Sequence, residues 1–291
     1  MRIFIIIALT AFIALVGLEA AIPEMPEPAA IILYTGNSLG KYDACPSCDG
    51  GESIGGLARR AAVISTYRQR YADKVFVLAG GNEFLPILPV EEPSARETEF
   101  TARAYGLMEY DLICLTAEEA GRLEGSGAEY LQDTLVFGKK PETRIITKGN
   151  VALGLVIFPD MGNPMAEPDK KAFDEVLATA RALRGETDLV VGVSSLGEPL
   201  EQRFLEDYPG AVDVLLGSGF GSGSGLSVRD SGTLWVRPEF NGWSVQAIRM
   251  LAAPKAGVAG WQEGENYDFE SIRLDEGIGQ NPAIAALMRL L

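Results

Sequence analysis

Residues 31–61 read IILYTGNSLGKYDACPSCDGGESIGGLARRA, and this stretch decides how the rest of the chain is interpreted. It begins with IILYT, an apolar run of strand length, which the polar and glycine-rich TGNSLG ends. A helix is predicted to begin near Gly56, because Leu57, Ala61 and Ile64 are apolar residues at helical spacing. The loop between such a strand and the next helix is where open α/β proteins place their functional groups.

The alternation of buried strands and helices continues along the first two thirds of the chain. Further strands are predicted at residues 74–79, 111–115, 188–193, 212–216, 226–228, 233–236 and 244–250, and a hairpin at 143–158. Helices are predicted at residues 97–108, 168–183, 199–208 and 282–290, with one or two helical turns over 127–135. Thr116 and Glu119 form a capping box that begins another short helix. The pattern predicts an α/β fold, a four-layer α/β/β/α sandwich made by a single domain over residues 30–291.

The amino-acid composition excludes several classes of function. The net charge of −15 repels the phosphates of nucleic acids and anionic lipids, so neither is expected as a partner. The chain contains no histidine, which excludes Ser-His-Asp hydrolysis, Cys-His proteolysis and the common zinc sites.

The N-terminus has the pattern of a secretory signal peptide. Arg2 precedes an apolar run over residues 3–18, and Leu18-Glu19-Ala20 is a plausible cleavage point, so residues 1–20 are predicted to be removed. Residues 21–29 are predicted to be an extended N-terminus of the mature protein. The apolar run is shorter than the roughly 20 residues of a spanning helix, so cleavage is favoured over an uncleaved anchor. A periplasmic or secreted protein without a membrane anchor is therefore expected.

Two of the three cysteines lie in the loop after the first strand, as Cys45-Pro46-Ser47-Cys48. Such a pair can cycle between dithiol and disulfide, and we predict Cys45 and Cys48 to be the catalytic residues of a redox function. The alternative is a structural disulfide that holds a long loop, which is usual in an oxidising compartment. The third cysteine, Cys114, lies in a predicted buried strand and is expected to be a core residue.

Other candidate residues have simpler explanations. Arg59 and Arg60 lie on the first helix and are expected to make surface ion pairs. Glu118 and Glu119 are explained by helix capping and solvation. The glycine-rich residues 217–225 lack the Lys-Ser/Thr of a phosphate-binding loop and are predicted to form a flexible, slack loop.

The order and spacing of the motifs resemble the metallophosphoesterase domain of the 5'-nucleotidase and UDP-sugar hydrolase family. TGNSLG at 35–40 and GGLARR at 55–60 match the family's T-N-D-x-H-G loop and G-G-x-A-R helix. AGGN, ending at Asn82, is similar to its A-G-D, and DLVVGVSSLG at 188–197 to its strand ending in S-H-x-G. The resemblance implies the calcineurin-like sandwich fold, and some relatives carry selenocysteine in the first loop. The C-terminal nucleotide-binding domain of the family is expected to be absent.

In this family two divalent metals are held by Asp, His and Asn, and this chain differs at the matching positions. The residues that stand there are Asn37, Leu39, Asn82, Ala117, Glu118, Ser195, Gly219 and Gly221. Because amides, alkyl groups and glycines cannot replace anionic or imidazole ligands, we expect no metal cofactor and no two-metal hydrolysis. A degenerate pocket is predicted at Asn37, Asn82, Glu118 and Ser195.

Three functional hypotheses follow from these patterns. The first is an exported thiol–disulfide exchange protein that acts on a redox partner protein. The second is a non-catalytic protein that binds a small ligand or a partner in the old pocket. The third is residual phosphoesterase activity.

Overall fold

The computed structural model describes residues 27–45, 51–87, 92–221, 224–229, 232–252 and 260–291. The predicted signal peptide and Cys48 lie outside the described residues, so neither prediction is tested here. Among the described residues, no helix combines the length and the apolar character needed to cross a bilayer.

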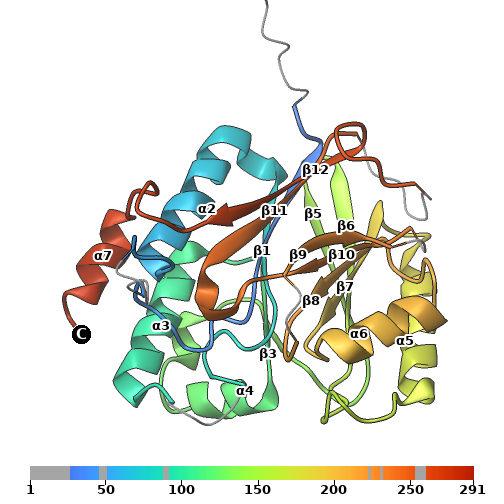
Figure 1. The fold of residues 1–291 in the computed structure, drawn as a ribbon, viewed down its shortest axis with the longest axis horizontal. Helices are drawn as coiled ribbons and strands as arrows, with labels where there is room; N and C mark the ends of the chain where they lie inside the picture. The colour runs from blue at the N-terminus through green and yellow to red at the C-terminus, as the bar shows by residue number, and fades with distance from the viewer. Residues whose placement is uncertain (1–26, 46–50, 88–91, 222–223, 230–231, 253–259) are drawn as a thin grey trace, which may run out of the picture.

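In the described part of the chain, two six-stranded sheets pack against each other (Figure 1). The first sheet has the order β12-β11-β1-β2-β3-β4, and the second has the order β5-β6-β7-β8-β10-β9. The strands of the first sheet are Ala30–Thr35 (β1), Val75–Ala79 (β2), Leu112–Leu115 (β3), Thr134–Val136 (β4), Ser244–Met250 (β11) and Tyr267–Arg273 (β12). Those of the second are Glu142–Lys148 (β5), Val151–Ile157 (β6), Leu189–Ser194 (β7), Val214–Gly217 (β8), Gly225–Val228 (β9) and Leu234–Arg237 (β10).

Helices cover the outer face of each sheet (Figure 1). Those beside the first sheet are Leu57–Tyr71 (α2), Ala95–Met108 (α3), Ala117–Leu123 (α4) and Pro282–Met288 (α7). Those on the second sheet are Lys170–Leu183 (α5) and Glu198–Asp207 (α6). Short 3-10 helices lie at Ala72–Lys74, Ala128–Tyr130 and Phe240–Gly242. The expected four-layer α/β/β/α sandwich is therefore confirmed.

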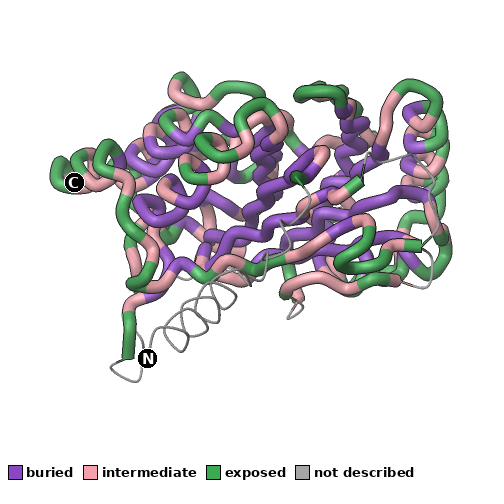
Figure 2. Tube along the Cα trace, turned by 90° about the horizontal axis from the view of Figure 1, so that it is seen from above, coloured by how far each residue is buried: buried purple, intermediate pink, exposed green. Residues whose placement is uncertain are grey.

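The central strands are buried on both faces, which explains why their sequences are continuous apolar runs. On β1, Ile31 and Leu33 pack toward the helices, whereas Ile32 and Tyr34 belong to the core between the two sheets. Figure 2 shows these strands as buried, with the exposed segments on the outer helices and loops. β1 is parallel to β2 and antiparallel to β11, so chain segments far apart in sequence are paired in its sheet.

Two edge regions differ from the sequence prediction. The residues over 127–135, predicted as helical turns, form one short 3-10 helix and then enter β4 at the edge of the first sheet. The strand β12 was not predicted, because YDFESIR mixes charged and apolar residues and much of it is exposed at the opposite edge. Edge strands with one open side do not need a continuous apolar sequence.

The predicted capping box of α4 is confirmed, and it also joins two loops. The Thr116 side chain accepts a hydrogen bond from the Glu119 backbone N–H, and the Glu119 carboxylate accepts one from the Thr116 N–H at 2.9 Å. The same carboxylate accepts hydrogen bonds from the N–H groups of Asn82 at 3.1 Å and Phe84 at 2.7 Å. Burial raises the pKa of Glu119 to about 7, against the opposing effect of these backbone hydrogen bonds.

We predict that Glu119→Ala lowers the free energy of unfolding by about 3 kcal/mol or more at pH 5, because it leaves buried backbone N–H groups without an acceptor. The difference between wild type and variant should shrink from pH 5 to pH 8. In this range the unfolded carboxyl has already lost its proton, whereas the folded one loses it only near its raised pKa of about 7, so the wild type loses stability.

Urea titrations at pH 5 and pH 8 measure both effects. The matched control is Glu118→Ala, which removes the exposed neighbouring carboxylate and should change the free energy of unfolding by less than about 0.5 kcal/mol. An equal loss at both pH values would contradict the assigned role of Glu119.

Candidate functional site

The loops that follow β1, β2, β7 and β8 meet at one end of the sandwich, where the resemblance places the metals of the family. The loop after β1 is paired with the loop after β2, since Asn37 N–H donates to Gly81 O at 3.1 Å and Leu39 N–H donates to Asn82 O at 2.8 Å. In the second sheet, Ser218 N–H donates to Ser194 O at 2.8 Å. Backbone hydrogen bonds therefore fix these loops within each sheet.

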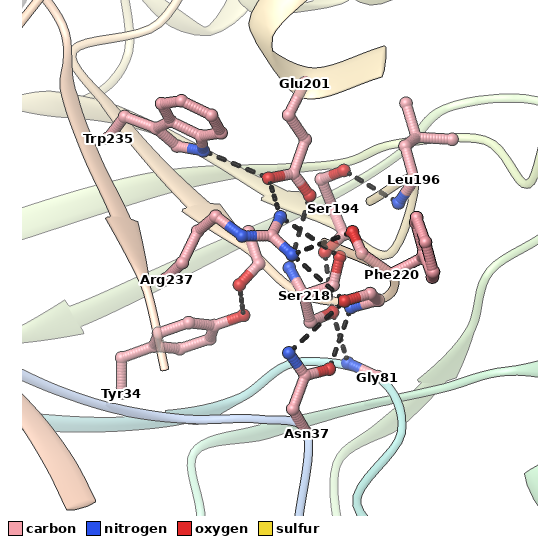
Figure 3. Close-up of polar contacts among 12 residues, drawn as sticks. Tyr34, Asn37, Gly81, Ser194, Leu196, Glu201, Ser218, Phe220, Trp235 and Arg237 are labelled. Atoms are coloured by element: carbon pink, nitrogen blue, oxygen red, sulfur yellow. Dashed lines mark hydrogen bonds and ion pairs between the residues drawn. The ribbon is translucent and has the colours of Figure 1, made fainter. Parts of the chain in front are cut away.

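Asn37 connects the two sheets (Figure 3). Its Oδ1 accepts a hydrogen bond from Gly219 N–H at 2.8 Å, and its Nδ2 donates to Gly219 O at 3.4 Å. The side chain is buried and the backbone is left-handed, with φ of 54°. The amide supplies both an acceptor and a donor, whereas an ionised aspartate would turn a carboxylate oxygen toward the Gly219 carbonyl.

A buried guanidinium lies at the centre of the loop ends (Figure 3). Arg237 donates hydrogen bonds to the carbonyl oxygens of Ser218 at 3.4 Å, Gly219 at 3.0 Å and Phe220 at 3.2 Å. It also forms an ion pair with Glu201, and the side chains of the two residues are 4% and 0% exposed. The residues over 217–219 are buried, so the prediction of a slack loop is wrong for this part of the segment.

Glu201 is held by further donors. Trp235 Nε1 donates to its carboxylate at 3.0 Å, and Ser218 N–H donates at 3.2 Å. Burial raises the pKa of Glu201, and the positive charge of Arg237 opposes this shift. The negative charge of the Glu201 carboxylate and the positive charge of the Arg237 guanidinium therefore compensate each other in the protein interior.

The glycines that stand at two ligand positions of the family have no room for a side chain. Gly219 has a φ of 83°, and a Cβ built on it would lie 2.5 Å from the Ser195 carbonyl oxygen. Gly221 has a φ of 124°, and a Cβ there would collide with the Glu198 side chain. Glycine is required at both positions by backbone conformation and by close packing.

A second buried cation lies behind the loop after β1. Arg60 donates to Ser38 Oγ at 2.5 Å and to the Tyr105 hydroxyl at 2.5 Å, and its Nη1 lies 3.5 Å from Glu83 Oε1. Glu83 also accepts a hydrogen bond from Thr35 Oγ1 at 2.5 Å. The expectation that Arg60 lies on the surface is wrong, because the loops after β1 and β2 fold over it.

Arg59, also expected on the surface, is buried as well. Its guanidinium donates to the carbonyl oxygens of Ser53 at 2.9 Å and Leu274 at 3.2 Å, and therefore joins the segment before α2 to the segment after β12. A sequence cannot distinguish such an arginine from one on an exposed helix face.

The other residues of the predicted degenerate pocket lie in different environments. Asn82 is half-buried and has a left-handed backbone, with φ of 62°. Ser195 is half-buried, and a Cβ built on Gly81 would lie 3.1 Å from the Ser195 Cβ. Glu118 is exposed, whereas the adjacent Glu119 is buried and makes the contacts with the loop after β2.

Sequence reasoning missed three charged residues that organise this end of the sandwich, Glu83, Glu201 and Arg237, and it placed a fourth, Arg60, on the surface. One feature of the sequence could have indicated Arg237. It stands at the carboxyl end of the buried strand LWVR, where parallel α/β sheets collect functional groups.

The described residues do not fit a two-metal centre. No group of three or more Cys, Asp, Glu or His side chains that could hold a metal ion occurs in the described ranges. Glu83, Glu119 and Glu201 already accept hydrogen bonds from protein donors, and two of them are paired with a guanidinium. Buried guanidinium groups at this end of the sandwich repel divalent cations.

A solvent-open cavity of about 420 Å³ lies outside the loop after β1. Its described lining is Leu39, Gly40, Lys41, Tyr42, Asp43, Ala44, Cys45, Glu92, Pro93, Glu97 and Asn241. Cys45 is exposed on this wall, and its backbone is paired with Ile54 through hydrogen bonds of 2.8 and 3.0 Å. The buried Cys114 has the opposite environment, because burial raises the pKa of its thiol and disfavours the thiolate.

No family model matches this sequence, and no curated protein matches it. Solved structures do share its fold. The sulfate thiohydrolase SoxB of Thermus thermophilus, in complex with glycerol, is similar with a TM-score of 0.67 and 16% identity over 91% of this chain and 60% of that one. A 5'-nucleotidase precursor, also of Thermus thermophilus, gives a TM-score of 0.62 and 12% identity over 90% of this chain and 58% of that one.

This chain therefore spans about three fifths of the length of these two structures. The calcineurin-like phosphoesterase YfkN of Bacillus subtilis gives a TM-score of 0.59 and 13% identity over 91% of this chain and 97% of that one. At such identities the likeness concerns the fold. The chain has the fold of the calcineurin-like phosphoesterases and 5'-nucleotidases.

Proposed function

We propose that this protein is exported and carries out thiol–disulfide exchange through Cys45 and Cys48, on a phosphoesterase fold that does not hydrolyse phosphate esters. The observation that carries the proposal is the position of Cys45, which is exposed on the wall of the 420 Å³ cavity. The buried ion pairs at the strand ends, which do not fit a metal centre, support the absence of hydrolysis. Export rests on the signal-peptide pattern of residues 1–20.

The proposed reaction needs only the two thiols and a substrate disulfide. The thiolate of Cys45 attacks one sulfur of the substrate, a mixed disulfide forms, and the other substrate sulfur leaves as a thiolate that takes up a proton. The thiolate of Cys48 then attacks Cys45 Sγ, so that the mixed disulfide breaks. The protein ends with a Cys45–Cys48 disulfide, and the substrate has gained two electrons and two protons.

A purely structural disulfide has less to contribute at this position. The hydrogen bonds between Cys45 and Ile54 already close the loop at its base. A bridge between cysteines separated by only two residues restrains a very short segment, and the chain-entropy model gives about 2 kcal/mol for it. This argument favours exchange over the structural alternative.

Non-catalytic binding in the same cavity is the second candidate. The lining combines aromatic, apolar and charged side chains, such as Tyr42, Pro93 and Glu97, as ligand sites commonly do. The two candidates make different predictions for the cysteines.

We predict that the Cys45–Cys48 pair has a reduction potential above about −300 mV and that its thiols react readily, because structural disulfides have potentials below this value. The full chain is equilibrated in dithiothreitol or glutathione buffers, and the thiols are counted after alkylation. Cys45→Ser and Cys48→Ser should abolish disulfide reduction, whereas the matched control Cys114→Ala should retain it. A potential below about −300 mV with inert thiols would favour the binding role.

We predict that Mn²⁺, Zn²⁺ and Co²⁺ neither activate phosphate-ester hydrolysis nor raise the melting temperature, because a ligand raises Tm only by binding the folded state. Metal-dependent turnover that is lost on chelation would overturn this prediction. Asn37→Asp restores the aspartate of the resembling family and should still not confer metal binding. It should lower the free energy of unfolding by about 1–3 kcal/mol, because its carboxylate would face the Gly219 carbonyl oxygen.

The control for this substitution is Asn163→Asp, which makes the same chemical change on an exposed loop. The Asn163 side chain accepts a hydrogen bond from Met165 N–H at 2.9 Å, which an aspartate can also accept. Its effect on unfolding should be below about 0.5 kcal/mol. Equal effects of the two substitutions would show that the Asn37 amide has no special role.

A further inference from the structure

The edge strand β5 has an open side. It pairs with β6, and in the described part of the chain no strand pairs with its other side. A two-residue turn joins β5 to β6, so Lys148 and Val151 form a hydrogen-bonded pair, and such pairs alternate along the hairpin. The backbone N–H and C=O groups of Thr143, Ile145 and Thr147 therefore point away from β6.

This side of β5 is exposed and partly apolar. Every residue of the strand except Ile146 and Lys148 is exposed, and Ile145 is 44% exposed. A row of outward backbone groups on an edge strand is a template for a further strand. Pairing would also remove the apolar surface of Ile145 from water.

The other three sheet edges are less suited to pairing with a second copy of the chain. β4 has three residues and β9 has four. β12 has seven, but antiparallel pairing about its central residue would place Glu270 opposite Glu270 of the second copy. Like charges directly opposite each other destabilise a strand pair.

The charges of β5 are instead complementary to themselves. Two copies related by a two-fold axis present the same patch to each other, and their edge strands then pair antiparallel. Pairing about the central residue places Ile145 opposite Ile145 and Thr143 opposite Thr147. At both ends of the strand pair, Glu142 faces Lys148 of the other copy.

Neighbouring registers lack this complementarity. Pairing about Arg144 would place two arginines opposite each other, and pairing about Ile146 would place Arg144 opposite Lys148. The register centred on Ile145 uses all seven residues of β5 and has no like charges in opposition. The charge pattern therefore selects one register.

Lys148 is positioned to bind a second carboxylate. Its Nζ lies 2.7 Å from Asp111 Oδ1 and donates to Val75 O at 2.8 Å, and its side chain is 22% exposed. An ammonium group has three donors, so its third N–H can reach Glu142 of a second copy.

We infer that the open side of β5 pairs antiparallel with β5 of a second copy of this chain, in the register centred on Ile145. The two six-stranded sheets then form one continuous sheet across the two-fold axis. A single strand pair buries less surface than a standard interface, so dimer and monomer are expected to exchange. This pairing is independent of the chemistry at Cys45.

A disulfide trap tests the register at the residue that faces itself. In a Cys45→Ser/Cys48→Ser background, Ile145→Cys places two thiols on Cα atoms about 5.5 Å apart, within the range of a disulfide. The protein is oxidised in glutathione buffer, and the covalent dimer is measured by non-reducing electrophoresis. We expect about fivefold or more cross-linking than for the matched control Thr143→Cys, because Thr143 faces Thr147 and not itself. The double variant Thr143→Cys/Thr147→Cys should cross-link again.

Sedimentation over a range of protein concentrations, in the same Cys45→Ser/Cys48→Ser background, tests the charge pairs. Glu142→Lys should raise the dissociation constant of the dimer by about tenfold or more, because both ends of the strand pair change from opposite to like charges. The matched control Glu270→Lys makes the same change of charge on the edge strand β12 and should leave the dissociation constant unchanged.

Three outcomes would overturn the inference. If the protein sediments as a monomer at every concentration and Ile145→Cys does not cross-link, β5 is not an interface. Equal cross-linking of Ile145→Cys and Thr143→Cys would show that the register is wrong. A dimer that Glu142→Lys and Glu270→Lys affect equally would form through another surface.

Discussion

The buried ion pair between Arg237 and Glu201 determines the arrangement of the loops at the strand ends. Arg237 ends β10, Glu201 lies on α6, and the carbonyl groups bound by the guanidinium belong to the loop after β8. Removing one partner of such a pair leaves an uncompensated buried charge, which is strongly destabilising. Gly219 also binds Asn37 of the loop after β1, so the same pair is linked to the first sheet at this end of the sandwich.

In this arrangement the side chains of the protein supply the hydrogen-bond partners of the polar groups at the strand ends. Loops at the carboxyl ends of parallel strands expose carbonyl groups and side chains that need partners. Here the partners are two guanidinium groups, those of Arg60 and Arg237, together with the Asn37 amide. These groups belong to the protein itself, and they bind the loops at the strand ends to one another. Cys45, the cysteine proposed to react, lies farther along the loop after β1, where it is exposed on the cavity wall.

The sequence predicts most of the fold, because the decisive elements have strong local patterns. The continuous apolar runs of β1, β2 and β7 predict buried strands, and Thr116 with Glu119 predicts the start of α4. The edge strand β12 is missed because its exposed side needs no apolar residues.

The site is harder to predict, because its main interactions join residues far apart in the chain. The contact between Asn37 and Gly219 spans 182 positions, and no local pattern reports it. Arg60 is on an amphipathic helix in the sequence and becomes buried only when two loops close over it. The most informative sequence observation about the chemistry of the site is a residue count, the absence of histidine.

The antiparallel bridge between Cys45 and Ile54 also influences which sequence changes this protein can tolerate. The bridge fixes the two ends of the intervening segment independently of what lies between them. Ser53, at the end of that segment, is held by Arg59 on α2, so substitutions before Ser53 are expected to disturb the sandwich least. Evolution or an engineer could therefore exchange residues 46–52 as a module while the hydrophobic layers stay intact.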